Sequence, residues 1–296
     1  MLKNILQSKK KTYKFFLLGS NGLLGSEFKK ILPQKETLTL AKSNAKIKSN
    51  LKDFQKLKKI FLKYKFKYVI NCIAITDVNK CEKFSENCLR INAKLPKLLS
   101  ELSIEHKFKL IQISTDHLYT GKINKNNKES FSLHTVNNYA RSKLISENYV
   151  KINKKNLVIR TNFTGFKKKI KSTFVGLIYY SILKKKKIKL YTDMYRSTLD
   201  VRTCAKLITK LIIKNAQGIY NCGTSLPLSK SEFAIYFAKQ MNKKLNYEKT
   251  SLDVNGVKRA KYQGLDVNKI EKKLGIKMIN PYKAIKNLTN RLPTLK

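Results

Sequence analysis

Residues 13–25 read YKFFLLGSNGLLG and join an apolar run to three glycines at three-residue spacing. The apolar run has the length and composition of a buried β-strand, and the second half reads as the start of a helix that Pro33 ends. Glycines at such a junction let the backbone turn tightly, let a pyrophosphate approach, and let the helix pack on the strand. The stretch predicts a phosphate loop with three cofactor-binding glycines, Gly19, Gly22 and Gly25.

Strand-like and helix-like segments alternate beyond this loop. Apolar runs typical of buried strands occupy residues 37–40, 68–74, 109–114 and 157–160. Helical spacing is found over residues 54–64, 81–102 and 139–151. This order predicts an α/β fold, a Rossmann-type doubly wound parallel sheet with right-handed crossovers.

The alternation loosens after residue 162. Residues 174–183, 201–213 and 231–241 read as helices, and residues 218–222 as a strand. We expect a dinucleotide-binding Rossmann core over residues 1–162 and a small C-terminal α/β lobe, mainly for substrate, over residues 163–296. Segments of the two parts are expected to interleave, because such lobes often borrow strands from the core sheet.

The charge of the chain is unusual. Lysine and arginine total 64 against 18 acids, a formal net charge of +46, and lysine supplies 57 of the 64. A polyanion binder would show such a charge, but so would the codon bias of an A/T-rich genome, which favours Lys, Asn and Ile. Arginine, the usual reader of phosphates and bases, is rare, and we see no zinc finger or aromatic RNA-binding signature. We therefore expect no specific nucleic-acid partner.

Composition bounds the remaining classes. A hydrophobic content of 42% excludes a mainly disordered chain. No apolar run approaches the ~20 residues of a membrane span, and the N-terminus does not read as a signal peptide. The five cysteines form no C-x-x-C pair and only three histidines exist, so we expect no metal site, no disulfides and a cytoplasmic protein.

The second strand carries the clue to the cofactor. An NAD-specific site would usually place Asp or Glu at its end, but here the sequence continues Ala41-Lys42-Ser43. Lys42 and Ser43 could instead meet a 2′-phosphate. The missing acid favours NADPH, or tolerance of both NADPH and NADH.

A Y-x-x-x-K pattern, Tyr139 to Lys143, carries the candidate chemistry. Residues i and i+4 share a helix face, so the ammonium would lie near the phenol and favour its ionised form. The pattern is weak alone in a chain with 15 tyrosines and 57 lysines. Thr115, however, ends the fourth strand, at the edge of an open α/β sheet where ligands bind. We predict that Thr115, Tyr139 and Lys143 form one catalytic set.

The chain resembles an extended short-chain dehydrogenase/reductase, and within that group it is similar to the dTDP-4-dehydrorhamnose reductase family. The segments GSNGLLG, VINCIAITDVNKCE, ISTDHLYTG, NNYARSKLISE, VIRTNF and GIYNCGT fall in the order of that family. The C-terminal RAKYQGLDVNKIEKKLGI also resembles the closing segment of the family. ISTDHLYTG and YARSK are the most specific of these matches.

The resemblance implies roles for individual residues. Tyr139 would be the acid/base, Lys143 its electrostatic partner and ribose ligand, and Thr115 a hydrogen-bond donor to the substrate carbonyl. Asp116 and Phe163 would contact the sugar nucleotide. The cofactor would be bound by Gly22, Leu23 and Leu24 at the pyrophosphate, Asn50 and Leu51 at the adenine, and Ile73, Ala74 and Ile75 at the nicotinamide.

Two residues depart from the family pattern. Asn50 stands where an aspartate is usual, and Phe163 where a tryptophan is frequent. Some members bind magnesium through acidic residues at a dimer interface. No match to those acids is found in this chain, so no metal is predicted, while a homodimer stays open.

The implied activity is NAD(P)H-dependent reduction of a 4-keto sugar nucleotide to a deoxysugar donor for surface polysaccharide. A 4,6-dehydratase would usually carry Glu after the Thr-Asp pair, where this chain has His117. Epimerisation on the same scaffold stays open, because it can use the same Thr/Tyr/Lys set. A non-catalytic, cofactor-binding regulatory subunit is a further alternative, although such a role does not require that set.

Overall fold

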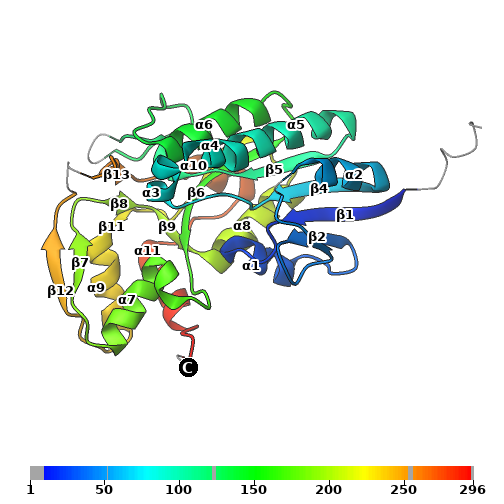
Figure 1. The fold of residues 1–296 in the computed structure, drawn as a ribbon. Coiled ribbons are helices and arrows are strands. Elements are labelled where there is room, and N and C mark those ends of the chain that lie inside the picture. Colours follow the sequence, from blue (N-terminus) through cyan, green and yellow to red (C-terminus); the bar gives the residue numbers. More distant parts are fainter. Residues whose placement is uncertain (1–9, 52, 122–124, 253–255, 295–296) are drawn as a thin grey trace, which may run out of the picture.

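A parallel sheet with helices on both faces dominates the computed structural model, which describes residues 10–51, 53–121, 125–252 and 256–294 (Figure 1). The strand order is β10-β6-β5-β4-β1-β2-β3, with β9 paired to β6, and every pairing in this sheet is parallel. Its strands are β1 (Lys11–Leu18), β2 (Thr37–Ala41), β3 (Ile47–Lys48), β4 (Tyr64–Asn71), β5 (Lys109–Ile113), β6 (Leu157–Thr164), β9 (Thr198–Asp200) and β10 (Gly218–Cys222). The predicted doubly wound sheet is confirmed.

The side chains of β1 explain why the second half of this strand, residues 15–18, is apolar without alternation. Successive residues of a strand point to opposite faces, so a strand covered on both sides needs apolar residues throughout. Phe15 and Leu17 belong to the core on the face of α1 (Leu23–Ile31). Phe16 and Leu18 belong to the core on the opposite face, with α2 (Gln55–Lys63) and α5 (Leu95–Glu105).

One expected strand is displaced. The apolar run at residues 68–74 predicts a strand there, whereas β4 begins and ends earlier, at Tyr64 and Asn71. The side chain of Asn71 donates to Gln112 Oε1 at 2.9 Å and accepts the N–H of Ile73 at 3.1 Å. This capping turns the chain out of the sheet, so the last apolar residues of the run line a cavity instead.

The single helix expected over residues 81–102 is divided. The structure has α3 (Val78–Lys83), α4 (Ser85–Leu89), a π-helical turn η1 (Arg90–Lys94) and then α5. Phe84 breaks the helix with φ −128° and ψ 58°. The π turn lies just before Pro96, whose ring would clash with the carbonyl of residue 92 in a regular α-helix. The remaining helix of this face is α6 (Asn138–Val150).

After β6 the chain alternates between the main sheet and a smaller lobe, seen beside one end of the sheet in Figure 1. The lobe has its own core, built around Ile178, Phe233, Phe237 and Ile285. The lobe and its flanking segments comprise η3 (Ile170–Ser172), α7 (Phe174–Leu183), β7 (Ile188–Tyr191), β8 (Tyr195–Arg196), β11 (Leu228–Ser229), α9 (Lys230–Gln240), β12 (Tyr247–Thr250), β13 (Tyr262–Gln263) and α11 (Pro281–Thr289).

Two later helices return to the main sheet. They are α8 (Val201–Ile213) and α10 (Asn268–Leu274). Leu207 and Ile208 of α8 pack into the same core as Phe28 of α1, and β10 closes the sheet edge next to β6. Residues beyond 162 therefore serve both the sheet and the lobe. The division into cofactor and substrate parts stays a prediction.

Within the described ranges, no helix has the length and apolarity needed to cross a bilayer. All five cysteines are free, and four of them are buried. They act as small apolar side chains in the packed layers.

Candidate active site

A cavity of about 380 Å³ lies at the carboxyl ends of β1, β4, β5 and β6 and extends to the lobe. This is the edge at which open α/β sheets bind ligands. The expected site residues that line it are Gly22, Leu23, Leu24, Ile73, Ala74, Thr115, Asp116, Tyr139, Lys143 and Phe163. The structure thus brings together residues that lie more than 140 positions apart in the sequence.

Two glycines of the loop shape it without lining the cavity. Gly19 has φ +78°, a conformation that favours glycine, and its N–H donates to the carbonyl of Leu40 at 2.8 Å. A Cβ on Gly25 would lie 2.1 Å from the carbonyl oxygen of Gly19. The close approach of helix to strand predicted for this loop is therefore present. Between the glycines, the buried hydroxyl of Ser20 has no hydrogen-bond partner in the described structure.

The other predicted cofactor residues lie outside the cavity lining. Lys42 is exposed directly after β2, and the Asn21 amide, from the glycine loop, donates to the carbonyl of the next residue, Ser43. Leu51 is buried, and its carbonyl accepts a bond from Arg90 at 2.8 Å. Asn50 precedes it on the same loop. Their proposed contacts with the adenosine half of a cofactor stay predictions.

Ile75 is held by its backbone rather than placed in the cavity. Its N–H donates to Asn92 Oδ1 at 2.8 Å, and its carbonyl accepts from Asn92 Nδ2 at 2.9 Å. The side chain lines a smaller neighbouring pocket instead. The segment that follows β4 is therefore fixed by a buried asparagine on the π turn.

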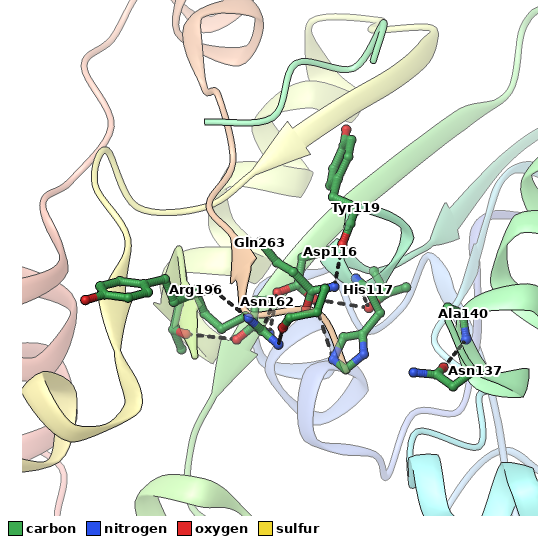
Figure 2. A network of polar contacts seen from close by, with 12 residues as sticks. Asp116, His117, Tyr119, Asn137, Ala140, Asn162, Arg196 and Gln263 are labelled. Carbon is green, nitrogen blue, oxygen red and sulfur yellow. Dashed lines mark hydrogen bonds and ion pairs between the residues drawn. The ribbon is translucent and has the colours of Figure 1, made fainter. Parts of the chain in front are cut away.

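Helix α6 presents Tyr139 and Lys143 to the cavity. Asn137 caps its first turn, where Oδ1 accepts the N–H of Ala140 at 2.8 Å (Figure 2). Tyr139 is 7% exposed and Lys143 is 2% exposed. The ammonium of Lys143 donates to the carbonyl of Ile113, the last residue of β5, at 2.5 Å. This bond fixes the lysine against the end of β5, and Thr115 lies two residues beyond that end and not on the strand as expected.

Burial sets the charge of both side chains. It raises the pKa of Tyr139 well above its ordinary range, and a hydrogen-bonding interaction with Thr115 opposes that rise. It also lowers the pKa of Lys143 to about 8, although the carboxylate of Glu147 acts in the opposite direction. The phenol is therefore protonated at neutral pH, so this chain's own groups do not bring it to the lowered pKa that the motif suggested.

Asp116 is fully buried beside Thr115 and carries an ion pair. Arg196 Nε lies 3.4 Å from Asp116 Oδ2, and Asn162 donates to the same oxygen at 2.9 Å. Figure 2 shows these three side chains converging from β8, β6 and the end of β5. Thr115 donates to the other oxygen, Oδ1, at 3.2 Å. Asp116 lines the cavity, yet its oxygens already have partners, so its contact with a sugar nucleotide stays a prediction.

His117 packs edge-on against Tyr139, with ring centroids 5.3 Å apart. Burial lowers its pKa to about 4, and the nearby cations Arg196, Lys230 and Arg259 act in the same direction, while Asp116 opposes them. The imidazole is therefore neutral at physiological pH. It supports the tyrosine ring by packing.

A second buried ion pair, between α6 and β6, lies next to the site. Glu147 accepts from Arg160 Nη2 at 2.7 Å and from the hydroxyl of Ser114 at 2.6 Å. Arg160 also donates to the hydroxyl of Tyr119 at 2.7 Å. The pair connects α6, β6 and the segment after β5, so it holds the backbone on both sides of the predicted catalytic set.

The sequence did not predict a role for Arg160, Arg196, Asn162 or Lys230. One signal was present, since the chain has only seven arginines among its 64 basic residues. In such a chain an arginine is the exception, and two of the seven are buried in ion pairs. Lys230 carried no signal among 57 lysines.

The fold and the site define an extended short-chain dehydrogenase/reductase. Residues 13–293 match the family model described as the RmlD substrate binding domain, and the chain belongs to that family. Its members are sugar-nucleotide reductases, which are oxidoreductases.

Relatives and solved structures agree with this assignment. A probable low-salt glycan biosynthesis reductase, Agl14, of Haloferax volcanii is 23% identical over 230 residues, covering 74% of this chain and 77% of the relative. The dTDP-4-dehydrorhamnose reductase of Bacillus anthracis, solved with NADP, has a TM-score of 0.85 at 22% identity. The match covers 97% of this chain and 100% of the Bacillus anthracis chain. A hypothetical dTDP-4-dehydrorhamnose reductase of Sulfolobus tokodaii has a TM-score of 0.81 at 25% identity, covering 90% of this chain and 97% of that chain.

Proposed function

We propose that this protein reduces a 4-keto sugar nucleotide with NADPH or NADH, giving a deoxysugar donor for a surface polysaccharide. One observation carries the proposal. Thr115, Tyr139 and Lys143 meet in a cavity that begins at the glycine loop and ends at the lobe. A cofactor and a substrate can therefore reach the same acid/base set from opposite ends.

The glycine loop fits a nicotinamide dinucleotide. Gly22, Leu23 and Leu24 line the cavity at the start of α1, where free N–H groups and the helix dipole favour a pyrophosphate. The buried, unpartnered hydroxyl of Ser20 belongs to the same loop, two residues before Gly22. Ile73, Ala74 and Lys143 would contact the nicotinamide half. The bound cofactor would supply the hydride.

The side chains of this chain would supply the proton and fix the carbonyl. Tyr139 is protonated at neutral pH, which is the state a general acid needs for a reduction. Its phenol would donate to the substrate oxygen as charge develops there. The Thr115 hydroxyl would turn from Asp116 to donate to the same oxygen. Lys143, held by the carbonyl of Ile113, would keep a positive charge near the developing phenolate.

A turnover assay tests the activity. Purified protein would be given NADPH and a panel of 4-keto sugar nucleotides, with cofactor oxidation and product identity both measured. The proposal expects one NADPH consumed for each sugar reduced. Isomerised product with no net consumption of cofactor would make the chain an epimerase, the alternative that uses the same residues.

The regulatory alternative predicts a different outcome. Tyr139→Phe removes the proposed acid but keeps the aromatic packing against His117. A catalytic role requires that polysaccharide synthesis in the cell fails with this variant. Normal synthesis alongside abolished turnover would instead favour a cofactor-binding regulatory subunit.

The end of β2 supports NADPH over NADH. The sequence directly after β2, Lys42-Ser43, contains no acid that could bind a free 2′-OH, and Lys42 is exposed. We expect kcat/KM with NADPH to be at least equal to that with NADH. Lys42→Ala should weaken NADPH more than NADH, by about 1–2 kcal/mol. The control is Lys35→Ala, which removes the same charge from the exposed turn that precedes β2. Equal losses for both cofactors would show that Lys42 does not contact the 2′ position.

A further inference from the structure

Lys230 contributes to the cavity from the lobe and not from the main sheet. It is the first residue of α9 and lines the cavity together with Phe174. A capping box fixes its backbone, in which Ser229 accepts the N–H of Glu232 at 3.1 Å and Glu232 accepts the N–H of Ser229 at 2.7 Å. The N–H of Lys230 itself donates to the carbonyl of Met194 at 3.1 Å. The lysine is thus held at a defined place in the lobe.

The ammonium of Lys230 lacks a carboxylate partner among the residues that the structure describes. It lies 3.9 Å from the ring centroid of Phe174 and forms no ion pair there. Asp116 is the acid in its surroundings, and that carboxylate is already bound by Arg196 and Asn162. Burial, and secondly repulsion by Arg196, lowers the pKa of Lys230 to about 8. A partly buried cation without a counter-ion favours an anionic ligand.

The position of Lys230 decides which anion this is. The cofactor pyrophosphate is expected at the glycine loop, directly after β1, and Lys143 is on α6. Lys230 lines the same cavity from α9, an element of the lobe. In a sugar-nucleotide reductase, the remaining strong anion is the diphosphate of the substrate.

We propose that Lys230 binds the diphosphate of the sugar-nucleotide substrate and orients the sugar toward Thr115 and Tyr139. The inference rests on the proposed function for its substrate class. It assigns the lobe a specific task, because the cation that holds the diphosphate of the substrate comes from α9 while the acid comes from α6.

Binding of dTDP and UDP, measured by calorimetry without turnover, tests the assignment. Lys230→Met should lower the affinity for both by roughly 10- to 100-fold, because a charge-assisted contact is lost. It should raise KM for the 4-keto sugar nucleotide by a similar factor and leave the Kd of NADPH unchanged. Lys230→Arg should restore most of the affinity. The control is Lys239→Met, the same charge change at the exposed far end of α9.

Two results would overturn the inference. The first is wild-type protein that binds neither dTDP nor UDP. The second is a Lys230→Met variant that binds both as the wild type does. Binding and turnover are separate measurements. Lys230-dependent binding without sugar reduction would refute the reductase and retain the diphosphate site, whereas reduction with unaltered dTDP binding would do the reverse.

Discussion

Burial determines the charge states at the catalytic set, residue by residue. Tyr139 is kept protonated and Lys143 has its pKa lowered to about 8, in both cases first by removal from water. Lys143 therefore gains or loses its proton close to physiological pH. The sequence motif predicted that these two residues act together, but it carried no information on their burial, which depends on α3 and α4 packing over α6.

The pKa of Lys143 predicts a pH dependence of stability. The unfolded chain binds this proton up to its ordinary pKa of 10.5, whereas the folded chain releases it at about 8. Stability should therefore rise with pH across that window. Relative to Lys143→Met, the free energy of unfolding of the wild type should increase by roughly 3 kcal/mol between about pH 7 and pH 10.5. Urea unfolding of both proteins measures this. A difference that stays constant, or falls as pH rises, would show that the folded pKa is not lowered.

Among the structural elements, the ion pair of Glu147 and Arg160 joins α6 to the sheet. Arg160 is 1% exposed and Glu147 is fully buried. Removing one partner of such a pair leaves an uncompensated buried charge. We expect Glu147→Gln to lower the free energy of unfolding by about 3–5 kcal/mol. Urea denaturation provides the value.

The matched control for that variant is Glu101→Gln. Glu101 pairs with Lys97 at 3.7 Å on α5, and both side chains are exposed. An exposed pair of this kind contributes only about 0.3–0.5 kcal/mol. Similar losses for the two variants would mean that the buried pair does not anchor the helix.

Most elements followed from local sequence, and the exceptions have local causes. The helix at Phe174–Leu183 and the strand at Gly218–Cys222 have the predicted bounds, because apolar patterning dominates in them. The prediction of one helix over residues 81–102 was wrong, because hydrophobic periodicity does not reveal the non-helical Phe84 or the π turn before Pro96. Apolar composition also predicted β4 several residues too far toward the C-terminus, because the strand ends where Asn71 bonds Gln112, a contact between strands that local composition does not reveal.

For the whole molecule, the order of strands was predictable and the pairing of distant charges was not. Alternating strand and helix patterns define the parallel sheet through general connection rules. The contact of Arg196 with Asp116 joins residues 80 positions apart, through the fold of the lobe. The fold of the lobe also brings Lys230, on α9, to the cavity. No spacing in the sequence indicates such contacts.

The net charge of +46 predicts weak, diffuse binding of polyanions. Release of counterions makes such binding strongly dependent on salt. Affinity for a mixed-sequence single-stranded RNA should fall at least ~10-fold between about 50 and 200 mM salt, with no preference for sequence. Fluorescence anisotropy would measure this. Tight, sequence-selective binding near physiological salt would instead point to a nucleic-acid function.

Transfer of deuterium from labelled cofactor tests the central claim most directly. NADPH carrying deuterium at C4 of the nicotinamide would be mixed with a 4-keto sugar nucleotide, and the product examined by mass spectrometry and NMR. We predict one deuteron at C4 of the reduced sugar, with the rate lowered roughly 10²- to 10⁴-fold in Tyr139→Phe, which lacks the proton donor. Product without deuterium, or a Tyr139→Phe rate equal to that of the wild type, would contradict the proposed reduction at this site.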